Sequence, residues 1–209
     1  CLAGQEVPQM YLAADVNPSV ASAEVVGHRM ECGRTEVAEK NWIPFTHQGG
    51  LFFVYSPVPH TVVSADAKGA CERRFSTEFL PLKRLLQKSP ELDIRGSGQA
   101  VLINDPDATP NLPQRHYLAL IHMFNRTSRM YAHFAYRFSP SPPFAILQVS
   151  SQLALLSARA DVGGPAFAFV SGLAVYSRTV AITYGAGDRD SRALVLTLSR
   201  LDEMFASCG

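Results

Sequence analysis

The densest group of side chains that could do chemistry is Glu39-Lys40-Asn41-Trp42. A carboxylate, an ammonium, an amide and the chain's single tryptophan follow one another there. Sugars are bound by an aromatic ring against their C–H face and by charged or amide groups on their hydroxyls. The four residues therefore predict a sugar site, with Glu39 as a candidate acid or base. The alternative is the start of a strand, with a solvated ion pair and a tryptophan in the core.

Three histidines, His116, His122 and His133, are predicted on or beside neighbouring strands, with Tyr131 close by. A metal trio is the less favoured interpretation, and we expect neither a metal nor an organic cofactor. His122 follows an apolar run, where a satisfied structural histidine is the commonest case. It could otherwise donate a hydrogen bond to a phosphate or a sugar hydroxyl, as a cation or as a neutral ring.

A glycine pair occurs in Arg95-Gly96-Ser97-Gly98-Gln99, just before a predicted strand. Its glycines allow a tight turn or a close approach of the backbone to a ligand, which makes Gln99 a candidate contact. We favour a plain loop turn over a ligand-binding loop.

A second glycine corner, Tyr184-Gly185-Ala186-Gly187-Asp188, ends an apolar run. Taken alone it is typical of a hairpin turn, because glycine supplies backbone freedom and aspartate is a common turn residue. Asp188 and Asp190 remain candidates for acid–base work or hydroxyl binding. Serine hydrolase chemistry is disfavoured because the sequence contains no Gly-x-Ser-x-Gly elbow.

Short apolar segments punctuated by Gly, Pro, Ser, Asn and Asp must position these residues. They predict strands near 10–16, 23–30, 51–56, 60–64, 99–104, 116–123, 131–138, 144–150, 167–176, 179–184 and 193–198. Helical spacing predicts short helices near 76–88, with Ser76 as the cap and Pro81 in the first turn, and near 199–206. Without a βαβ rhythm the fold class is all-β: a sandwich, a barrel or a propeller.

Composition limits the function classes. The chain has 209 residues, 47% hydrophobic and 18% charged, with a formal net charge of +1. Such a balance offers no electrostatic footprint for nucleic acid, and no apolar run is long enough to span a membrane. Four widely spaced cysteines disfavour zinc and fit either buried thiols or one or two disulfides. The sequence leaves localisation open between the cytoplasm and the secretory-pathway lumen.

Three segments in order resemble one family. "EKNWIPF", "RHYLALIHMFNRTSRMYAHFAYRFSPSPPFAILQVSSQLALL" and "FAFVSGLAVYSRTVAITYGAGDRDSRALVLTLSRLDEMF" are similar to stretches of the five-bladed β-propeller β-mannoside phosphorylases and β-1,2-mannosidases. The resemblance extends to mannosyltransferases and to propellers that accompany glycosyltransferases. It implies one β-propeller domain over 1–209, incomplete with about four blades here and part of a longer chain.

By this resemblance Lys40, Asn41 and Trp42 line a central sugar cavity, His122 and Tyr131 hold phosphate, and Asp188 accepts hydrogen bonds from sugar hydroxyls. The implied function is inverting phosphorolysis or hydrolysis of a mannoside-like glycan, or glycosyl transfer from a sugar donor, with inorganic phosphate as a co-substrate. The family's Glu-Asp-Pro-Arg stretch, which carries a phosphate-binding Arg, is absent. The family's general acid, an Asp that also lies in the N-terminal part, has no counterpart assigned here. The alternative is a non-catalytic sugar-binding propeller that works with a glycosyltransferase domain in cis or in trans.

Overall fold

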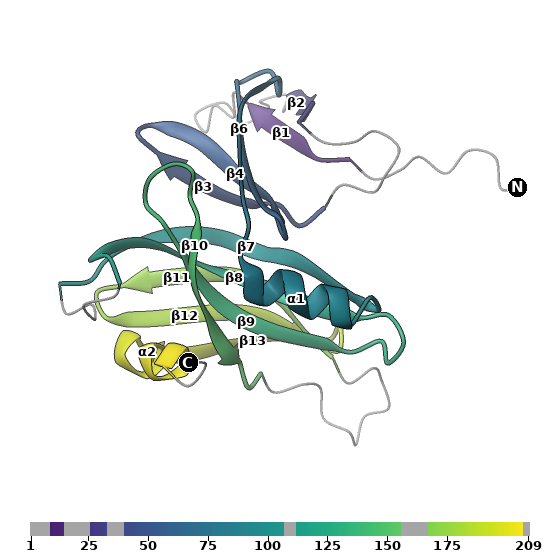
Figure 1. Ribbon diagram of the computed structural model, residues 1–209, viewed down its shortest axis with the longest axis vertical. Coiled ribbons are helices and arrows are strands. Elements are labelled where there is room, and N and C mark those ends of the chain that lie inside the picture. The colour runs from purple at the N-terminus through teal and green to yellow at the C-terminus, as the bar shows by residue number, and fades with distance from the viewer. Residues whose placement is uncertain (1–8, 15–25, 33–39, 107–111, 156–166, 207–209) are drawn as a thin grey trace, which may run out of the picture.

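The computed structural model describes residues 9–14, 26–32, 40–106, 112–155 and 167–206, which form antiparallel sheets and two short helices (Figure 1). An N-terminal ribbon pairs β1 (Tyr11–Ala14) with β2 (Val26–Arg29). The first sheet contains β3 (Ile43–His47), β4 (Gly50–Pro57), β5 (His60–Ala65) and β6 (Cys71–Thr77). The second sheet contains β7 (Leu92–Asn104), β8 (Arg115–Asn125), β9 (Tyr131–Phe138) and β10 (Ile146–Gln152). The third sheet contains β11 (Ala168–Tyr176), β12 (Thr179–Ala186) and β13 (Asp190–Thr197). Helix α1 (Leu80–Lys88) joins the first two sheets, and α2 (Leu198–Ala206) follows the third.

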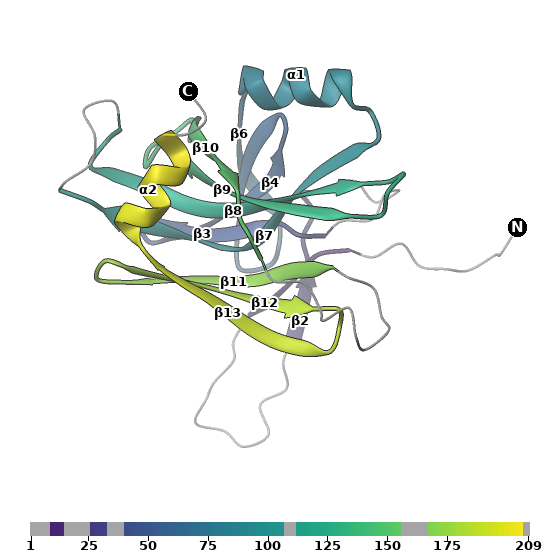
Figure 2. The same cartoon turned by 90° about the horizontal axis from the view of Figure 1, so that it is seen from below.

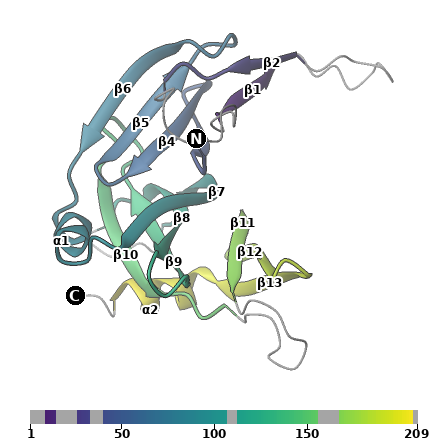
Figure 3. The ribbon, with the colours of Figure 1, turned by 90° about the vertical axis from the view of Figure 1, so that its right-hand side faces the viewer.

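The three larger sheets are meanders, in which neighbours along the chain are neighbours in the sheet. The first strand of the second sheet, β7, lies against both β3 and β11, the first strands of the other two sheets. Figure 3 shows the sheets following one another along an arc, which does not close within the described part of the chain. Viewed from below, α1 covers the side of the second sheet that faces away from β11–β13 (Figure 2).

The glycine pair that we predicted as a loop turn lies instead inside β7. A Cβ atom on Gly96 would come within 2.5 Å of the Asn41 carbonyl oxygen, and one on Gly98 within 3.1 Å of the Gly172 Cα. The missing side chains therefore let β3 and β11 approach β7 closely, so the glycines serve contact between sheets.

The second sheet separates two hydrophobic cores. Along β8, Ala119 and Ile121 pack toward the first sheet, whereas Leu118 and Leu120 pack toward the third. β8 is buried on both faces, and a strand in that position has a nearly continuous run of apolar residues in its sequence. The alternation nevertheless assigns each β8 side chain to one core.

The sequence patterns predicted most of the observed strands and both helices. Every predicted strand overlaps a described one, whereas β3 and β6 were missed. β3 contains Pro44, and β6 presents exposed charged residues; both are edge strands, where such residues are tolerated.

Both predicted helices are present. Pro81 occupies the first turn of α1 as predicted, but Ser76 lies in β6 and the helix begins after Phe79 without a side-chain cap.

A disulfide joins Cys32, which follows the N-terminal ribbon, to Cys71 in β6, with Cα atoms 4.9 Å apart. The interpretation of four buried free thiols is therefore wrong for these two cysteines, while Cys1 and Cys208 lie outside the described residues. Neither described helix has the length and apolar character needed to cross a membrane.

Candidate functional site

A cavity of about 570 Å³, here called the cationic cavity, opens where β7 and the β8–β9 hairpin meet the segment before β3. It contains four of the residues that the sequence singled out and six that it did not. The lining residues are Lys40, Asn41, Asp93, Arg95, His122, Phe124, Arg126, Arg129, Tyr131 and Phe169.

Strand alternation brings the cavity's aromatic and histidine side chains together. His122 pairs with His133 and Phe124 with Tyr131 across the β8–β9 ladder, so all four lie on the face of the second sheet toward β11. Their rings are close: the Phe124 and Tyr131 centroids are 4.8 Å apart, and Phe169 of β11 lies 5.7 Å from Tyr131. The three hydrophobic or phenolic rings form an aromatic wall on which a sugar's C–H face could lie.

The turn between β8 and β9 supplies two of the cavity's cations, Arg126 and Arg129. The Asn125 side-chain oxygen accepts hydrogen bonds from two backbone N–H groups of this turn, both at 2.9 Å, which fixes its shape. The Arg129 guanidinium lies 5.3 Å from the centre of the Phe124 ring, in cation–π contact. The turn therefore presents its cations directly beside the aromatic wall.

Charge in the cavity is strongly unbalanced. Asp93 accepts a 2.8 Å hydrogen bond from Arg95, which neutralises that pair. Lys40, Arg126 and Arg129 are exposed, and no ion pair joins any of them to a described acidic side chain. The arrangement favours an anion with several acceptor oxygens, such as a phosphate.

His122 is neutral near pH 7. Burial, helped by the positive charge that His133 could carry, lowers the pKa of His122 to about 4. Its Nδ1 lies 2.9 Å from the Ser97 hydroxyl oxygen. The ring is 3% exposed and one nitrogen is satisfied by Ser97, as expected for a structural histidine, and any contact with a ligand would come from a neutral ring rather than a cation.

The histidines do not form a metal trio. His116 is buried apart from the cavity, with its Nδ1 3.0 Å from the Pro113 carbonyl oxygen. The described residues hold no group of three or more His, Cys, Asp or Glu that could bind a metal ion.

Two predicted contacts lie elsewhere. Trp42 is 5% exposed and packs edge-on against Phe53 and Tyr55, which matches the core alternative. Gln99 donates a 2.5 Å hydrogen bond to the Leu173 carbonyl of β11, so its amide ties β7 to the third sheet.

Two of the candidate carboxylates, Asp188 and Asp190, are not among the residues that line the cavity. Asp188 is exposed in the β12–β13 turn with φ of 54°, directly after Gly187, whose N–H bonds to the Phe167 carbonyl at 2.8 Å. The turn thus borders the chain segment that leads to Phe169 without lining the cavity. Asp190 is exposed and bonds to Arg192. Glu39 lies outside the described residues.

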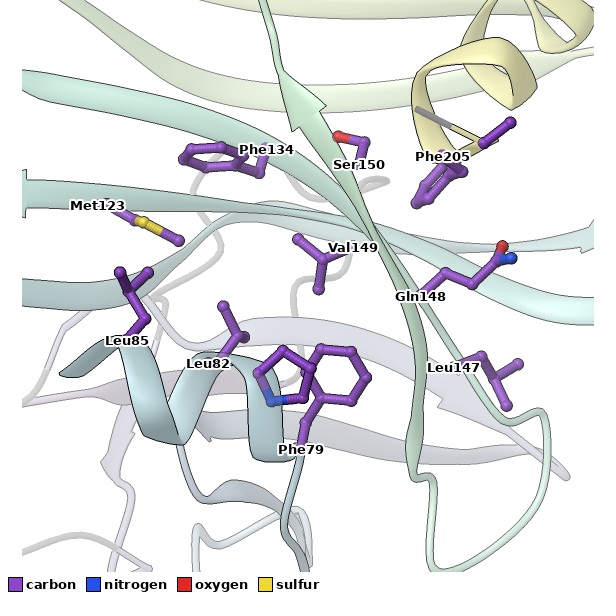
Figure 4. Close-up of a pocket in the computed structure, with 12 residues that line it drawn as sticks. Phe79, Leu82, Leu85, Met123, Phe134, Leu147, Gln148, Val149, Ser150 and Phe205 are labelled. Atoms are coloured by element: carbon purple, nitrogen blue, oxygen red, sulfur yellow. The ribbon is translucent and has the colours of Figure 1, made fainter. Parts of the chain in front are cut away.

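A second hollow lies on the opposite face of the same hairpin. This apolar groove of about 620 Å³ runs between α1, β10 and the end of α2. Figure 4 shows Leu82 and Leu85 of α1 opposite Met123, Phe134 and Val149. None of the described residues that line it is charged, so these residues offer neither the anion contacts nor the acid–base groups of the cationic cavity.

Sequence reasoning missed six cavity residues: Asp93, Arg95, Phe124, Arg126, Arg129 and Phe169. One signal could have found Arg126 and Arg129: they lie in the short turn between the strand that contains His122 and the strand that begins at Tyr131. Those of β7 and β11 depend on how these strands pack beside that hairpin, which no local pattern reveals.

No protein-family model matches this chain, and no curated protein does. Among solved structures, the chain is similar to a β-1,2-mannobiose phosphorylase from Listeria innocua in complex with β-1,2-mannobiose, with a TM-score of 0.52 and 12% sequence identity. The match covers 80% of this chain and 47% of the phosphorylase, so the chain spans about half of that protein's length. Likeness at this identity establishes a shared fold.

Proposed function

We propose that the chain is part of a carbohydrate-active β-propeller that binds a mannoside-like glycan and a phosphate group in the cationic cavity. The observation that carries the proposal is the aromatic wall of Phe124, Tyr131 and Phe169 beside three cations without described acidic partners. A sugar ring needs the first feature and a phosphate needs the second.

The propeller itself is supported by three features. The larger sheets are meanders, their first strands lie side by side, and the fold resembles part of a mannobiose phosphorylase. In such an arrangement the cationic cavity opens at one end of the first strands, where a propeller's central channel would begin.

The chemistry that fits the cavity is inverting glycosyl transfer to or from phosphate. Phosphate attacks the anomeric carbon from one face while a carboxylic acid protonates the leaving oxygen on the other. Lys40, Arg126 and Arg129 would hold the phosphate oxygens, and neutral His122 and the Tyr131 hydroxyl would donate hydrogen bonds. Glu39 stays the candidate acid.

A non-catalytic sugar-binding module, working with a glycosyltransferase in cis or in trans, is the second candidate. One observation favours it: Asp93 is the one carboxylate among the described lining residues, and its hydrogen bond with Arg95 leaves it poorly suited to act as a general acid. Both candidates require the cavity to bind a sugar; the phosphate contacts belong to the proposal made above, and only the first candidate requires turnover.

Calorimetric titration of the chain with mannose 1-phosphate tests the shared requirement. We expect measurable binding that falls about tenfold or more in the Arg126→Ala variant, because a charge-assisted hydrogen bond is lost. Lys83→Ala, which removes an exposed cation of α1 outside the cavity, is the matched control. Absence of binding, or equal losses in both variants, would exclude the proposal.

Turnover is tested separately. Incubation of β-1,2-mannobiose with and without phosphate, followed by measurement of mannose 1-phosphate and free mannose, distinguishes a phosphorylase, which forms mannose 1-phosphate, from a hydrolase, which releases only mannose. Binding without either product supports the non-catalytic module.

A further inference from the structure

A third cavity shares a wall with the cationic cavity. This adjoining cavity, of about 450 Å³, lies on the other side of the start of β7, between the first sheet and α1. Five residues line both cavities: Lys40, Asn41, Asp93, Arg95 and Arg126. The two hollows therefore meet along one line of polar side chains.

Charge is concentrated at this junction. Two of the three cations, Lys40 and Arg126, lie there, while Arg129 lines the cationic cavity alone; the Asp93–Arg95 pair at the junction is neutral overall. The rest of the adjoining cavity is uncharged and is lined by side chains such as Tyr55, Val58 and Leu86. A ligand that fills both hollows would thus have its negative charge in the middle and uncharged groups at both ends.

Inorganic phosphate or a sugar monophosphate would satisfy the cations but leave the adjoining cavity empty. A phosphate diester or diphosphate diester carries an organic group on each side of its anionic centre. Such a ligand would place a ring against Phe124 and Tyr131 and its second group beside Tyr55 and Leu86.

We infer that the two cavities form one extended site for a sugar joined through a phosphodiester or diphosphate bridge to a second organic group. The inference rests on the proposed function for the position of the sugar, and it adds the chemical class of the donor or product. Stacking and apolar burial of the second group supply the added affinity over a monoester.

The test compares a monoester with two diesters on the intact chain. Mannose 1-phosphate, GDP-mannose and UDP-glucose are titrated calorimetrically. We expect at least one of the diesters to bind tenfold or more tightly than the monoester.

A matched pair of variants on α1 locates the second group. Leu86 lines the adjoining cavity and Leu85 the apolar groove, and both are half-buried. Leu86→Trp, which fills the adjoining cavity, should weaken the tighter diester about tenfold and change mannose 1-phosphate binding less than twofold. Leu85→Trp should change neither. Tyr55→Ala, with the same readouts, replaces Leu86→Trp if that variant fails to fold.

The outcomes separate this inference from the proposed function. Monoester binding without a gain from either diester, or without an effect of Leu86→Trp and Tyr55→Ala on the diester, would overturn the extended site and leave the sugar-phosphate site intact. Failure of all three ligands to bind would overturn both.

Discussion

The two faces of the β8–β9 hairpin carry opposite kinds of surface. His122 and Tyr131 line the cationic cavity. Met123, the next residue after His122, and Phe134, three residues after Tyr131, line the apolar groove. One hairpin thus contributes to a charged, aromatic hollow and to an apolar one, because successive strand residues point to opposite faces. Consecutive residues of β8, His122 and Met123, therefore serve different ends: one lines the cavity proposed to bind a ligand, and the other packs near α1.

The largest effect on stability is expected from a residue of α1 that lines the apolar groove. Leu82 is 4% exposed and belongs to the core beneath α1, so Leu82→Ala should lower the free energy of unfolding by about 2–5 kcal/mol. Binding of sugar phosphate to the folded protein should be unchanged. Urea unfolding measures the first effect, with Leu80→Ala, which alters a 54% exposed residue of the same helix, as control. Equal losses in the two variants would contradict the packing of α1 on the second sheet.

The second prediction concerns the cationic cavity: protonation of His122 should make the stability of the protein depend on pH. The pKa of His122 is lowered to about 4 by burial, whereas an unfolded histidine titrates near 6.5. The unfolded chain therefore binds the proton more readily, and stability present above pH 6.5 is lost as the pH falls toward 4, by about 3 kcal/mol from this group. His60 and His133, with pKa values also lowered to about 4, act in the same direction.

Unfolding of the parent and of His122→Gln should be compared between pH 7.5 and 4.5. The variant should lose less stability over this interval, because one of the titrating groups is gone. Parallel losses in the two proteins would show that His122 is not buried in its neutral form.

A pair of phenylalanines sharpens the contrast between the faces. Phe124→Ala should weaken mannose 1-phosphate binding by about 1 kcal/mol, or roughly fivefold, because a stacking surface is lost. Phe134→Ala, on the groove face, should reduce stability and leave affinity within twofold. Calorimetric titration of both variants with mannose 1-phosphate measures the difference. A loss of affinity in Phe134→Ala but not in Phe124→Ala would indicate that the sugar binds in the apolar groove.

The smallest effect is expected at Asp188. Its φ of 54° is left-handed, so Asp188→Gly should be neutral or stabilising by less than about 1 kcal/mol, whereas Asp188→Ala should be mildly destabilising. Thermal unfolding measures this difference. An affinity loss above about fivefold in Asp188→Gly would assign the side chain to the ligand, as the sequence resemblance implies.

Local patterns predicted much of the fold. The strand predicted near 131–138 is β9, with the same bounds. Helical spacing near 76–88 and 199–206 predicted two helices close to the observed α1 and α2. Patterns failed where a strand breaks the local rules, as in proline-containing β3 and charged β6, because edge strands tolerate residues that interior strands exclude.

The sequence by itself determined the elements, the alternation that assigns His122 and Tyr131 to one face, and the tight turns that join the strands, since these depend on residues close together in the chain. Only the tertiary structure decided that β7 lies against β3 and β11, with Gly96 and Gly98 at the contacts. That packing brings Lys40, Arg126 and Phe169 to one cavity from three distant segments, and it sends Trp42 into the core. Contacts of such sequence separation depend on how whole sheets fit together, so no local periodicity specifies them.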